Sequence, residues 1–295
     1  MSEVTPIVGM VGIGRMGGAM SSVLADAGHE LILFNRDTSK SAAVAAKTGA
    51  IVAGSPAEVA TKADVIITSL ADDVAVTAVY EGDDGIVSGM GLGKIAIDTS
   101  TVDPETVRRV GDTVEETGAG FLDCPVSGSV ATVEAGALTI MAGGDANLLD
   151  RVRPILEPLS SRVIHVGGRG AGAATKLAVN GLVHGLNVAL AEALVLAEKA
   201  GVDRATAYEV FVSGAGGAPF VQYKRAAYEH PEEAQVAFSL DLVAKDLELI
   251  TALAEKVGAP MSQASTGLEI VRQAMEAGLA DRDMSAIAVY LRGDA

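Results

Sequence analysis

The sequence is poor in cysteine, in aromatic residues and in positive charge. Of its 295 residues one is cysteine, Cys124, none is tryptophan, and aromatic residues make up 3%. A single cysteine allows no disulfide within the chain, which is typical of proteins of the reducing cytoplasm. The 22 Lys and Arg against 38 Asp and Glu leave a net charge of −16. We therefore expect neither nucleic acid nor an anionic membrane surface as a partner.

The chain also lacks the usual signals for export or membrane insertion. Residues 1–5 show no basic start followed by an apolar run, so we expect no signal peptide. Residues 177–197 are nearly uncharged and long enough to cross a bilayer, yet they carry four polar side chains that lipid would penalise. These are Asn180, His184, Asn187 and Glu192. We expect a buried helix of a cytoplasmic protein, covered by its own chain or by a partner subunit.

Apolar runs alternate with helical patterns through the first half of the chain. The expected strands are residues 7–11, 30–35, 50–52, 64–69, 94–98, 120–123, 138–142 and 163–166. The expected helices between them are residues 18–27, 39–48, 55–62, 73–80, 104–117 and 147–159. Such alternation is typical of a mostly parallel sheet with helices on both faces.

Strand patterns stop after Gly172, and helical periodicity continues to the end of the chain. The expected helices are residues 173–200, 203–212, 218–228, 240–257, 261–277 and 284–291, with glycine and proline breakers between them. We predict an α/β domain over residues 1–165 and an all-α domain over residues 166–295. The second domain would begin with a long helix that joins the two.

A glycine-rich turn follows the first strand. Gly12, Gly14 and Gly17 fit the pattern G-x-G-x-x-G, with a strand before them and a helix after them. In this motif the first glycine permits the tight turn, the second lets backbone approach a pyrophosphate, and the third lets helix and strand pack closely. The first domain is therefore expected to be Rossmann-type. Its expected dinucleotide contacts are Gly12, Ile13, Gly14, Arg15, Met16 and Gly17.

The end of the second strand indicates which dinucleotide is preferred. An NAD enzyme usually has Asp or Glu there, accepting hydrogen bonds from the ribose, whereas this chain has Asn35 followed by Arg36. Asn35 brings no charge to repel a 2′-phosphate, and Arg36 can pair with it. Thr38 and Lys40 add a hydroxyl and a second cation, provided that Asp37 points away. The sequence predicts NADP rather than NAD.

Two further loops bear on phosphate and cofactor binding. Residues 89–95 look like part of a phosphate-binding P-loop, but Ile95 stands where that motif needs Ser or Thr for Mg²⁺. We interpret them as a turn before a strand. Other cofactor contacts are expected just beyond the later strands, at Leu70, Ala71 and Thr101.

Two segments carry candidate substrate chemistry. Ser127 and Gly128 follow a strand and offer a hydroxyl and backbone N–H groups to a carboxylate, although an ordinary Ser-Gly turn would look the same. Lys176, Asn180 and His184 are spaced four apart, so they share one face of the long helix. Burial would lower the pKa of Lys176 and suit it to proton transfer, but a helix-start lysine that reaches solvent is equally compatible. We expect His184 to be a packed core residue.

With these motifs in order, the sequence resembles the β-hydroxyacid dehydrogenases, a family that includes 3-hydroxyisobutyrate dehydrogenase and tartronate semialdehyde reductase. The resemblance covers essentially the whole chain. Residues 12–17 match the family's cofactor loop, and residues 123–144 match its substrate-binding signature. Lys176 falls on its catalytic lysine and Asn180 on its substrate-binding asparagine. Lys245 begins a Lys-Asp-Leu segment whose lysine, in the family, approaches cofactor and substrate.

The resemblance implies an oxidoreductase that interconverts a short β-hydroxy acid and its semialdehyde, with Lys176 as general acid and base, and the residues after the second strand predict NADP as its cofactor. It also implies a homodimer or homotetramer. The implied substrate contacts are Ser127, Gly128, Ser129, Asn180 and Lys245, and Lys245 is implied as a cofactor contact too. Ser129 departs from the family, which often has a second glycine there, and Gly181 stands where many members have asparagine. These departures concern the substrate more than the reaction.

Other functions remain possible at this stage. An imine reductase would share the architecture, but the equivalent of Lys176 is commonly acidic or Tyr in those enzymes. A non-catalytic dinucleotide sensor is the alternative from another class, and the presence of Lys176 and Asn180 argues against it. The four histidines are scattered without ligand spacing, so no metal is expected.

Overall fold

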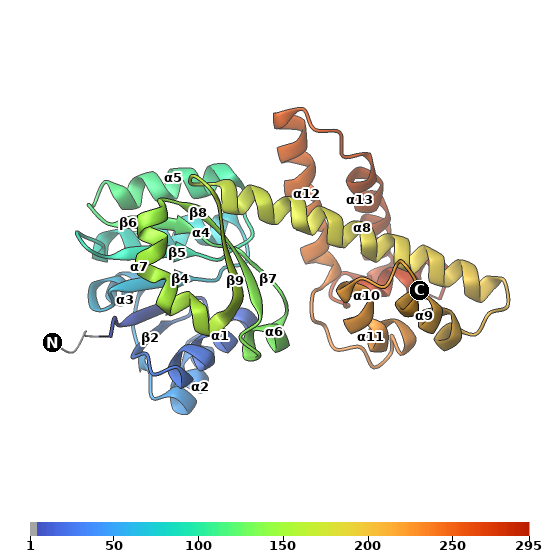
Figure 1. The fold of residues 1–295 in the computed structure, drawn as a ribbon, viewed down its shortest axis with the longest axis horizontal. Helices are drawn as coiled ribbons and strands as arrows, with labels where there is room; N and C mark the ends of the chain where they lie inside the picture. The colour runs from blue at the N-terminus through green and yellow to red at the C-terminus, as the bar shows by residue number, and fades with distance from the viewer. Residues whose placement is uncertain (1–4, 295) are drawn as a thin grey trace. The chain divides into compact units, whose positions relative to one another are not determined.

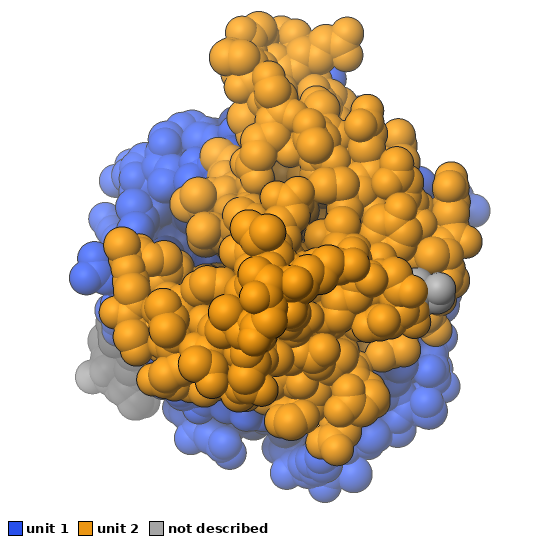
Figure 2. Space-filling view, turned by 90° about the vertical axis from the view of Figure 1, so that its right-hand side faces the viewer, with its two compact units in different colours: residues 1–176 blue, residues 177–295 orange. Residues whose placement is uncertain are grey.

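The computed structural model describes residues 5–294. They form two compact units, which divide after Lys176 (Figure 2). The division falls after Lys176 rather than after residue 165. The reason is local, because strand β9 (Ser160–Gly167) pairs with β8 (Leu138–Gly144) and the start of the next helix is bonded to Asp123.

The first unit is built on one sheet (Figure 1). Besides β8 and β9, its strands are β1 (Val8–Val11), β2 (Leu31–Phe34), β3 (Ile51–Val52), β4 (Val65–Thr68), β5 (Ile95–Asp98), β6 (Gly120–Asp123) and β7 (Val126–Ser127). The order is β3-β2-β1-β4-β5-β6-β8-β7, with β9 beside β8. The strands from β3 to β6 are parallel, and β8 runs antiparallel to both β6 and β7. The 3-2-1-4-5-6 order confirms the predicted Rossmann-type domain.

Helices cover both faces of this sheet, because alternate strand residues point to opposite sides. Ile67 and Ile97 pack in one core with residues of helices α1 and α7, whereas Ile66 and Ala96 pack in the other with residues of α3, α4 and α5. The helices of this unit are α1 (Arg15–Asp26), α2 (Thr38–Thr48), α3 (Pro56–Lys62), α4 (Asp73–Glu81), α5 (Pro104–Glu115), α6 (Val130–Glu134) and α7 (Ala146–Leu156). Short 3₁₀ turns are η1 (Ile86–Gly89) and η2 (Glu157–Leu159).

The second unit is helical, as predicted. Its elements are α8 (Ala171–Lys199), which starts in the first unit, then α9 (Arg204–Ser213), α10 (Pro219–Tyr223), α11 (Arg225–Glu229), α12 (Leu240–Val257), α13 (Ser262–Ala274), η3 (Met275–Leu279), η4 (Met284–Ala286) and α14 (Ile287–Arg292). Their apolar faces, including those of Leu194, Leu247 and Val271, form one core.

Two predicted helices are interrupted for identifiable reasons. The helix predicted over residues 218–228 breaks at Lys224, whose side chain is buried and pairs with Asp283. The helix predicted over residues 261–277 stops at Ala274 and continues as the π-type turn Met275–Leu279, within which Gly278 has φ of 89°. Helix α6 and strand β7 were missed because five and two residues are too short to show a period.

Helix α8 is the one described helix long and apolar enough to cross a membrane, judged by length and composition alone. Half of its most apolar window is nevertheless buried inside the protein. Its polar side chains have protein partners. Asn187 Nδ2 donates to the Met284 carbonyl at 3.0 Å, and Tyr228 donates its hydroxyl to Asn187 Oδ1 at 2.8 Å. These partners are what a buried core helix requires.

Candidate functional site

The three glycines of the first turn meet different demands. Gly12 has φ of 96°, and a Cβ on it would lie 2.3 Å from the carbonyl oxygen of Ser69. A Cβ on Gly17 would lie 1.9 Å from the carbonyl oxygen of Gly12. Gly14, in contrast, has φ of −77°, and a Cβ there would meet no described protein atom within 4 Å. The fold itself requires Gly12 and Gly17, whereas Gly14 keeps space open for a ligand.

Helix α1 begins at this turn without a competing anion. Within residues 5–294, no side chain caps its N-terminus and its first turn contains no acidic residue. The partial positive charge of the helix end and its N–H groups therefore face the open space at Gly14. This arrangement fits the pyrophosphate of a dinucleotide.

The end of β2 is joined to the glycine turn by Asn35. Its Oδ1 accepts the N–H of Ile13 at 2.9 Å, and its Nδ2 donates to the carbonyl of Asp37 at 2.9 Å. The Asp37 carboxylate caps helix α2 by accepting from the Ser39 N–H at 3.1 Å and from the Ser39 hydroxyl at 2.6 Å. Asp37 is thereby engaged at α2, while Arg36 is exposed beside it.

Thr38 and Lys40 lie in the first turn of α2, next to Arg36. Both are exposed, as is Arg36. The residues that follow β2 therefore offer two cations and a hydroxyl, while the Asp37 carboxylate takes the N-terminus of α2. That combination suits a phosphate group better than a neutral ribose hydroxyl.

The loops after β4 and β5 are joined at the same edge of the sheet. Leu70 donates its N–H to Ser100 Oγ at 3.0 Å, and Asp73 Oδ1 accepts the N–H of Asp103 at 2.9 Å. Leu70, Ala71 and Thr101, the predicted cofactor contacts, lie on these two loops. Because β4 and β5 are parallel neighbours, their carboxyl ends lie together where doubly wound sheets bind ligands.

The predicted carboxylate-binding segment follows β6. Ser127 is half-buried in β7, and Gly128 is exposed with φ of 147°, a conformation that favours glycine. Ser129 is the N-cap of α6, where Thr132 Oγ1 accepts the Ser129 N–H and contacts the Ser129 hydroxyl, both at 3.1 Å. Ser129 is thus tied into the loop, while Ser127 and Gly128 lie before it.

Asp123, the last residue of β6, holds the start of helix α8. Its Oδ1 accepts the N–H of Gly170 and its Oδ2 the N–H of Ala173, each at 2.9 Å. Asp123 is 1% exposed, and burial raises the pKa of its carboxyl against the effect of these backbone hydrogen bonds. A Cβ on Gly172 would lie 2.4 Å from the Asp123 carbonyl oxygen, so the backbones meet closely. Lys176 lies one turn beyond this anchor.

The second unit groups three polar side chains around Asp246. Asn180 Nδ2 donates to Asp246 Oδ2 at 2.6 Å, and His184 Nε2 lies 3.4 Å from the same oxygen. Lys245 Nζ lies 2.9 Å from Asp246 Oδ1. Burial would raise the pKa of Asp246, but the His184 hydrogen bond and the Lys245 charge outweigh it, so the pKa is lowered. Asp246 is therefore held as an anion.

This cluster orients residues that the sequence singled out. His184 is stacked on Phe238, with ring centroids 6.0 Å apart, and its buried Nδ1 has no hydrogen-bond partner among the described residues. A buried Nδ1 without an acceptor favours the tautomer that carries its proton on Nε2, toward Asp246. His184 is a packed core residue, as predicted, but it also supports Asp246.

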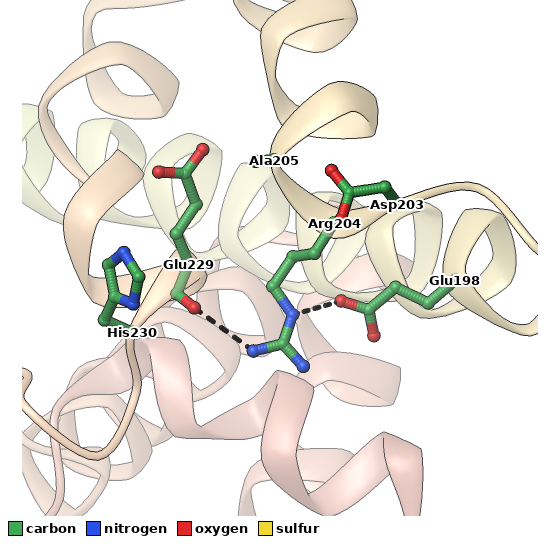
Figure 3. Close-up of a pocket in the computed structure, with 6 residues that line it drawn as sticks. All are labelled: Glu198, Asp203, Arg204, Ala205, Glu229 and His230. Atoms are coloured by element: carbon green, nitrogen blue, oxygen red, sulfur yellow. Dashed lines mark hydrogen bonds and ion pairs between the residues drawn. The ribbon is translucent and has the colours of Figure 1, made fainter.

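A cavity of about 480 Å³ lies elsewhere in the second unit (Figure 3). It is lined by Glu198, Asp203, Arg204, Ala205, Glu229 and His230. Its guanidinium, that of Arg204, is already bonded to Glu198 and to the Glu229 carbonyl, as the dashed lines in Figure 3 show. The cavity contains none of the sequence-predicted residues, so we do not assign the reaction to it.

The structure also shows what surrounds two lysines outside this cluster. Lys94 donates to the carbonyls of Ala60 at 2.6 Å and Ala63 at 2.5 Å, so the loop before β5 stabilises the end of α3, as expected of a structural turn. Lys224 is 4% exposed and lies 2.8 Å from both Asp283 carboxylate oxygens. Among residues 5–294, no group of three or more His, Cys, Asp or Glu side chains is placed to hold a metal ion.

Sequence reasoning gave no role to the three buried aspartates Asp98, Asp123 and Asp246. Each is at most 1% exposed, and each bonds groups that are far away in the sequence. Their position in the sequence could have indicated a role for two of them. Asp98 and Asp123 each end an apolar strand, at the carboxyl edge of a parallel sheet where ligands bind. Their partners depend on tertiary contacts and leave no local pattern.

Comparison with known proteins supports the same interpretation. The family model described as the NAD binding domain of 6-phosphogluconate dehydrogenase matches residues 7–167. The model described as the NAD-binding part of NADP-dependent 3-hydroxyisobutyrate dehydrogenase matches residues 170–291. Together the two models cover both structural units.

Three similar proteins illustrate the range of the family. Glyoxylate/succinic semialdehyde reductase 1 of Arabidopsis thaliana is 35% identical over 95% of this chain and 96% of its own length. The NAD-dependent L-serine dehydrogenase of Pseudomonas aeruginosa is 31% identical over 95% of this chain and 96% of its own. The solved 3-hydroxyisobutyrate dehydrogenase of Mycobacterium tuberculosis with L-serine has a TM-score of 0.86 and 32% identity, covering 98% of this chain and 100% of that one.

The glycine turn, the sheet order and these matches agree with one another. Relatives above 30% identity align over nearly the full length of both partners and are named dehydrogenases or reductases. The chain therefore belongs to the β-hydroxyacid dehydrogenase family, and it is an NAD(P)-dependent oxidoreductase.

Proposed function

We propose that the protein is an NADP-dependent oxidoreductase that interconverts a short β-hydroxy acid and its semialdehyde, with Lys176 as the general acid and base. The observation that carries this proposal is the anchored start of helix α8. Asp123 fixes the helix at Gly170 and Ala173, and Lys176 follows one turn later. A lysine on the first turns of an anchored helix has a fixed backbone position, and proton transfer requires a positioned group.

The protein's own residues have distinct parts in this mechanism. The bound cofactor supplies the hydride in reduction and accepts it in oxidation. Lys176 donates a proton to the aldehyde oxygen in reduction and takes the hydroxyl proton in oxidation. Asn180 lies one turn after Lys176 on the same helix face, and its amide is fixed by the Asp246 carboxylate at 2.6 Å. We assign Asn180 and Lys245 to substrate contact, and Lys245 to cofactor contact as well.

The substrate is a small carboxylate. Ser127 and Gly128 supply a hydroxyl and a backbone N–H to it, with Ser129 shaping the loop through Thr132. We propose a three- or four-carbon hydroxy acid as the size class. Similarity to a glyoxylate/succinic semialdehyde reductase supports this size class.

NADP preference rests on the residues around the end of β2. Arg36, Thr38 and Lys40 are all exposed, and the acidic side chain among them, that of Asp37, is engaged at helix α2. Asn35 uses its amide to hold the glycine turn rather than to present a negative charge. One relative is named NAD-dependent, so cofactor choice varies within the family and must be measured here.

We further propose a cytoplasmic homodimer or homotetramer. The single cysteine, Cys124, is buried and free, which suits a reducing compartment. Leu182 and Leu196 on helix α8 are 67% and 73% exposed, and a second copy of the chain would cover them.

The experiment is a panel of short semialdehydes assayed by the loss of NADPH absorbance, with NADH in parallel. We expect turnover of at least one three- or four-carbon semialdehyde, faster with NADPH. NADPH binding without turnover on the whole panel would contradict the semialdehyde assignment and favour an imine or a larger carbonyl substrate. Faster turnover with NADH would contradict the cofactor assignment alone.

A further inference from the structure

A buried carboxyl at the cofactor edge of the sheet has no part in the mechanism above. Asp98 is the last residue of β5 and is 1% exposed. Burial raises the pKa of its carboxyl to about 6 in spite of hydrogen bonds from Thr68 and Ser100. Burying a carboxyl costs free energy unless it is hydrogen-bonded. The contacts of Asp98 therefore indicate its role.

Two hydroxyl groups converge on a single oxygen of Asp98. Thr68 Oγ1 donates to Asp98 Oδ1 at 2.5 Å, and Ser100 Oγ donates to the same atom at 2.7 Å. Each hydroxyl has one proton, which it donates in its hydrogen bond to Asp98. Both hydroxyl oxygens are therefore left as acceptors for other groups.

The two branches lead to different parts of the unit. Ser100 Oγ accepts the Leu70 N–H at 3.0 Å, so this branch reaches the loop after β4. Thr68 Oγ1 lies 3.1 Å from the Tyr80 hydroxyl, so the other branch reaches the buried side of helix α4. Tyr80 is 0% exposed and packs edge-on against Phe121.

The Ser100 branch spans the two loops expected to contact the cofactor. Residues 69–72 follow β4 and residues 99–102 follow the neighbouring parallel strand β5. The Thr99 N–H also donates to the Thr68 carbonyl at 2.9 Å, and the Thr99 hydroxyl to the same oxygen at 2.6 Å. Asp98 thus orients the hydroxyl through which the first loop is attached to the second.

We propose that Asp98 is a positioning residue for the nicotinamide cofactor: by orienting the Ser100 hydroxyl it holds loops 69–72 and 99–102 in one arrangement, against which the cofactor binds. The inference rests on the proposed function, because it takes Leu70, Ala71 and Thr101 as cofactor contacts. A surface fixed before binding loses less conformational entropy when the ligand arrives. Loosening these loops would therefore weaken cofactor binding more than substrate binding.

The test compares the two branches. Ser100→Ala cuts the branch to Leu70, whereas Tyr80→Phe cuts the branch to helix α4 and keeps the packed ring. We expect Ser100→Ala to raise the Kd and the KM for NADPH about 10-fold, the loss of roughly one hydrogen bond, with kcat and the KM for the semialdehyde little changed. Tyr80→Phe should change the Kd for NADPH less than about twofold by the same reasoning. Nicotinamide fluorescence measures the Kd, because the chain has no tryptophan.

Substitutions of Asp98 itself provide the second arm. Asp98→Asn keeps a carbonyl oxygen that accepts from both hydroxyls, so we expect an NADPH Kd within about threefold of the wild type. Asp98→Ala removes the acceptor and should match Ser100→Ala. Melting temperatures recorded on every variant separate loss of binding from loss of fold.

Several outcomes would overturn the proposal. Equal weakening by Ser100→Ala and Tyr80→Phe would show that general loosening is responsible, and equal weakening by Asp98→Asn and Asp98→Ala would show that the acceptor is not what matters. If the wild-type protein binds NADPH and Ser100→Ala binds it equally well, the inference fails alone. If the wild-type protein binds neither NADPH nor NADH, the proposed function fails and the inference fails with it.

Discussion

Replacing Asp123 by Ala should separate the anchoring of helix α8 from the rest of the fold. The change removes two hydrogen bonds, both 2.9 Å long, from the start of the helix that carries Lys176. Hydrogen bonds to a charged acceptor are worth ~1.5–3 kcal/mol each, which would make ~3–6 kcal/mol for two. Burial raises the pKa of Asp123, so part of that gain is already offset by desolvation. We expect a net loss of ~2–4 kcal/mol in the free energy of unfolding.

The loss of stability should appear as a fall in Tm of roughly 5–15 °C. Activity measured well below the new Tm should fall further than the loss of stability explains. Displacing a catalytic acid or base by about 1 Å can lower the rate on the order of 100-fold. We therefore expect kcat to fall by ~10–100-fold while the Kd for NADPH stays close to the wild-type value.

A matched control is available at another helix start in the same unit. Asp145 caps α7 by accepting the Asn147 N–H at 2.6 Å and the Leu148 N–H at 3.3 Å, and it is exposed. Asp145→Ala should cost ~1 kcal/mol and leave kcat unchanged. The reasoning is refuted if Asp123→Ala lowers the Tm as expected yet keeps the wild-type kcat.

Three other predictions follow from the structure. Arg36→Ala should raise the KM for NADPH at least ~10-fold and leave that for NADH within ~2-fold, because only NADPH carries the 2′-phosphate; equal effects on both cofactors in parallel kinetics would contradict the assignment. Burial raises the folded-state pKa of Asp98 to about 6, so the ionised carboxyl destabilises the fold above pH 6. Lowering the pH from 8 to 5 should therefore raise the free energy of unfolding of the wild type by about 1.4 kcal/mol relative to that of Asp98→Asn. Urea unfolding at both pH values measures this, and a constant difference would show that Asp98 does not titrate in this range. Lys224→Met should cost ~3–5 kcal/mol, because it leaves Asp283 buried without its cation, whereas Lys62→Met in an exposed pair with Glu58 should cost under ~1 kcal/mol in the same urea assay.

The sequence was informative where a local pattern reports a global constraint. The glycine turn at residues 12–17, bounded by a strand and a helix, was sufficient to predict a Rossmann-type unit, because few other structures need glycine at that spacing. Helix α12 was predicted with its observed bounds, since its apolar period is regular and Gly258 ends it in a left-handed conformation, with φ of 70°. The helical half of the chain followed from the same periodicity.

Patterns failed where tertiary contacts override local preference. Lys224 follows an aromatic, helix-like segment, and nothing near it in sequence indicates that Asp283 would draw it into the core. Each of the three buried aspartates likewise bonds a group between 30 and 66 residues away, so their roles appear only in three dimensions. The two units divide after Lys176, beyond the predicted boundary at residue 165, for a similar reason. The hydrogen bonds from Gly170 and Ala173 to Asp123 place the start of α8 in the first unit.

The account depends most on Lys176 as the proton donor and acceptor, and the direct test is Lys176→Ala assayed with and without added primary amines. General acid–base catalysis contributes ~10²–10⁴-fold, so we expect kcat to fall by that factor, the Kd for NADPH to stay near the wild-type value, and small amines such as methylamine to restore part of the rate. Retention of most of the wild-type kcat without amine would contradict the central claim.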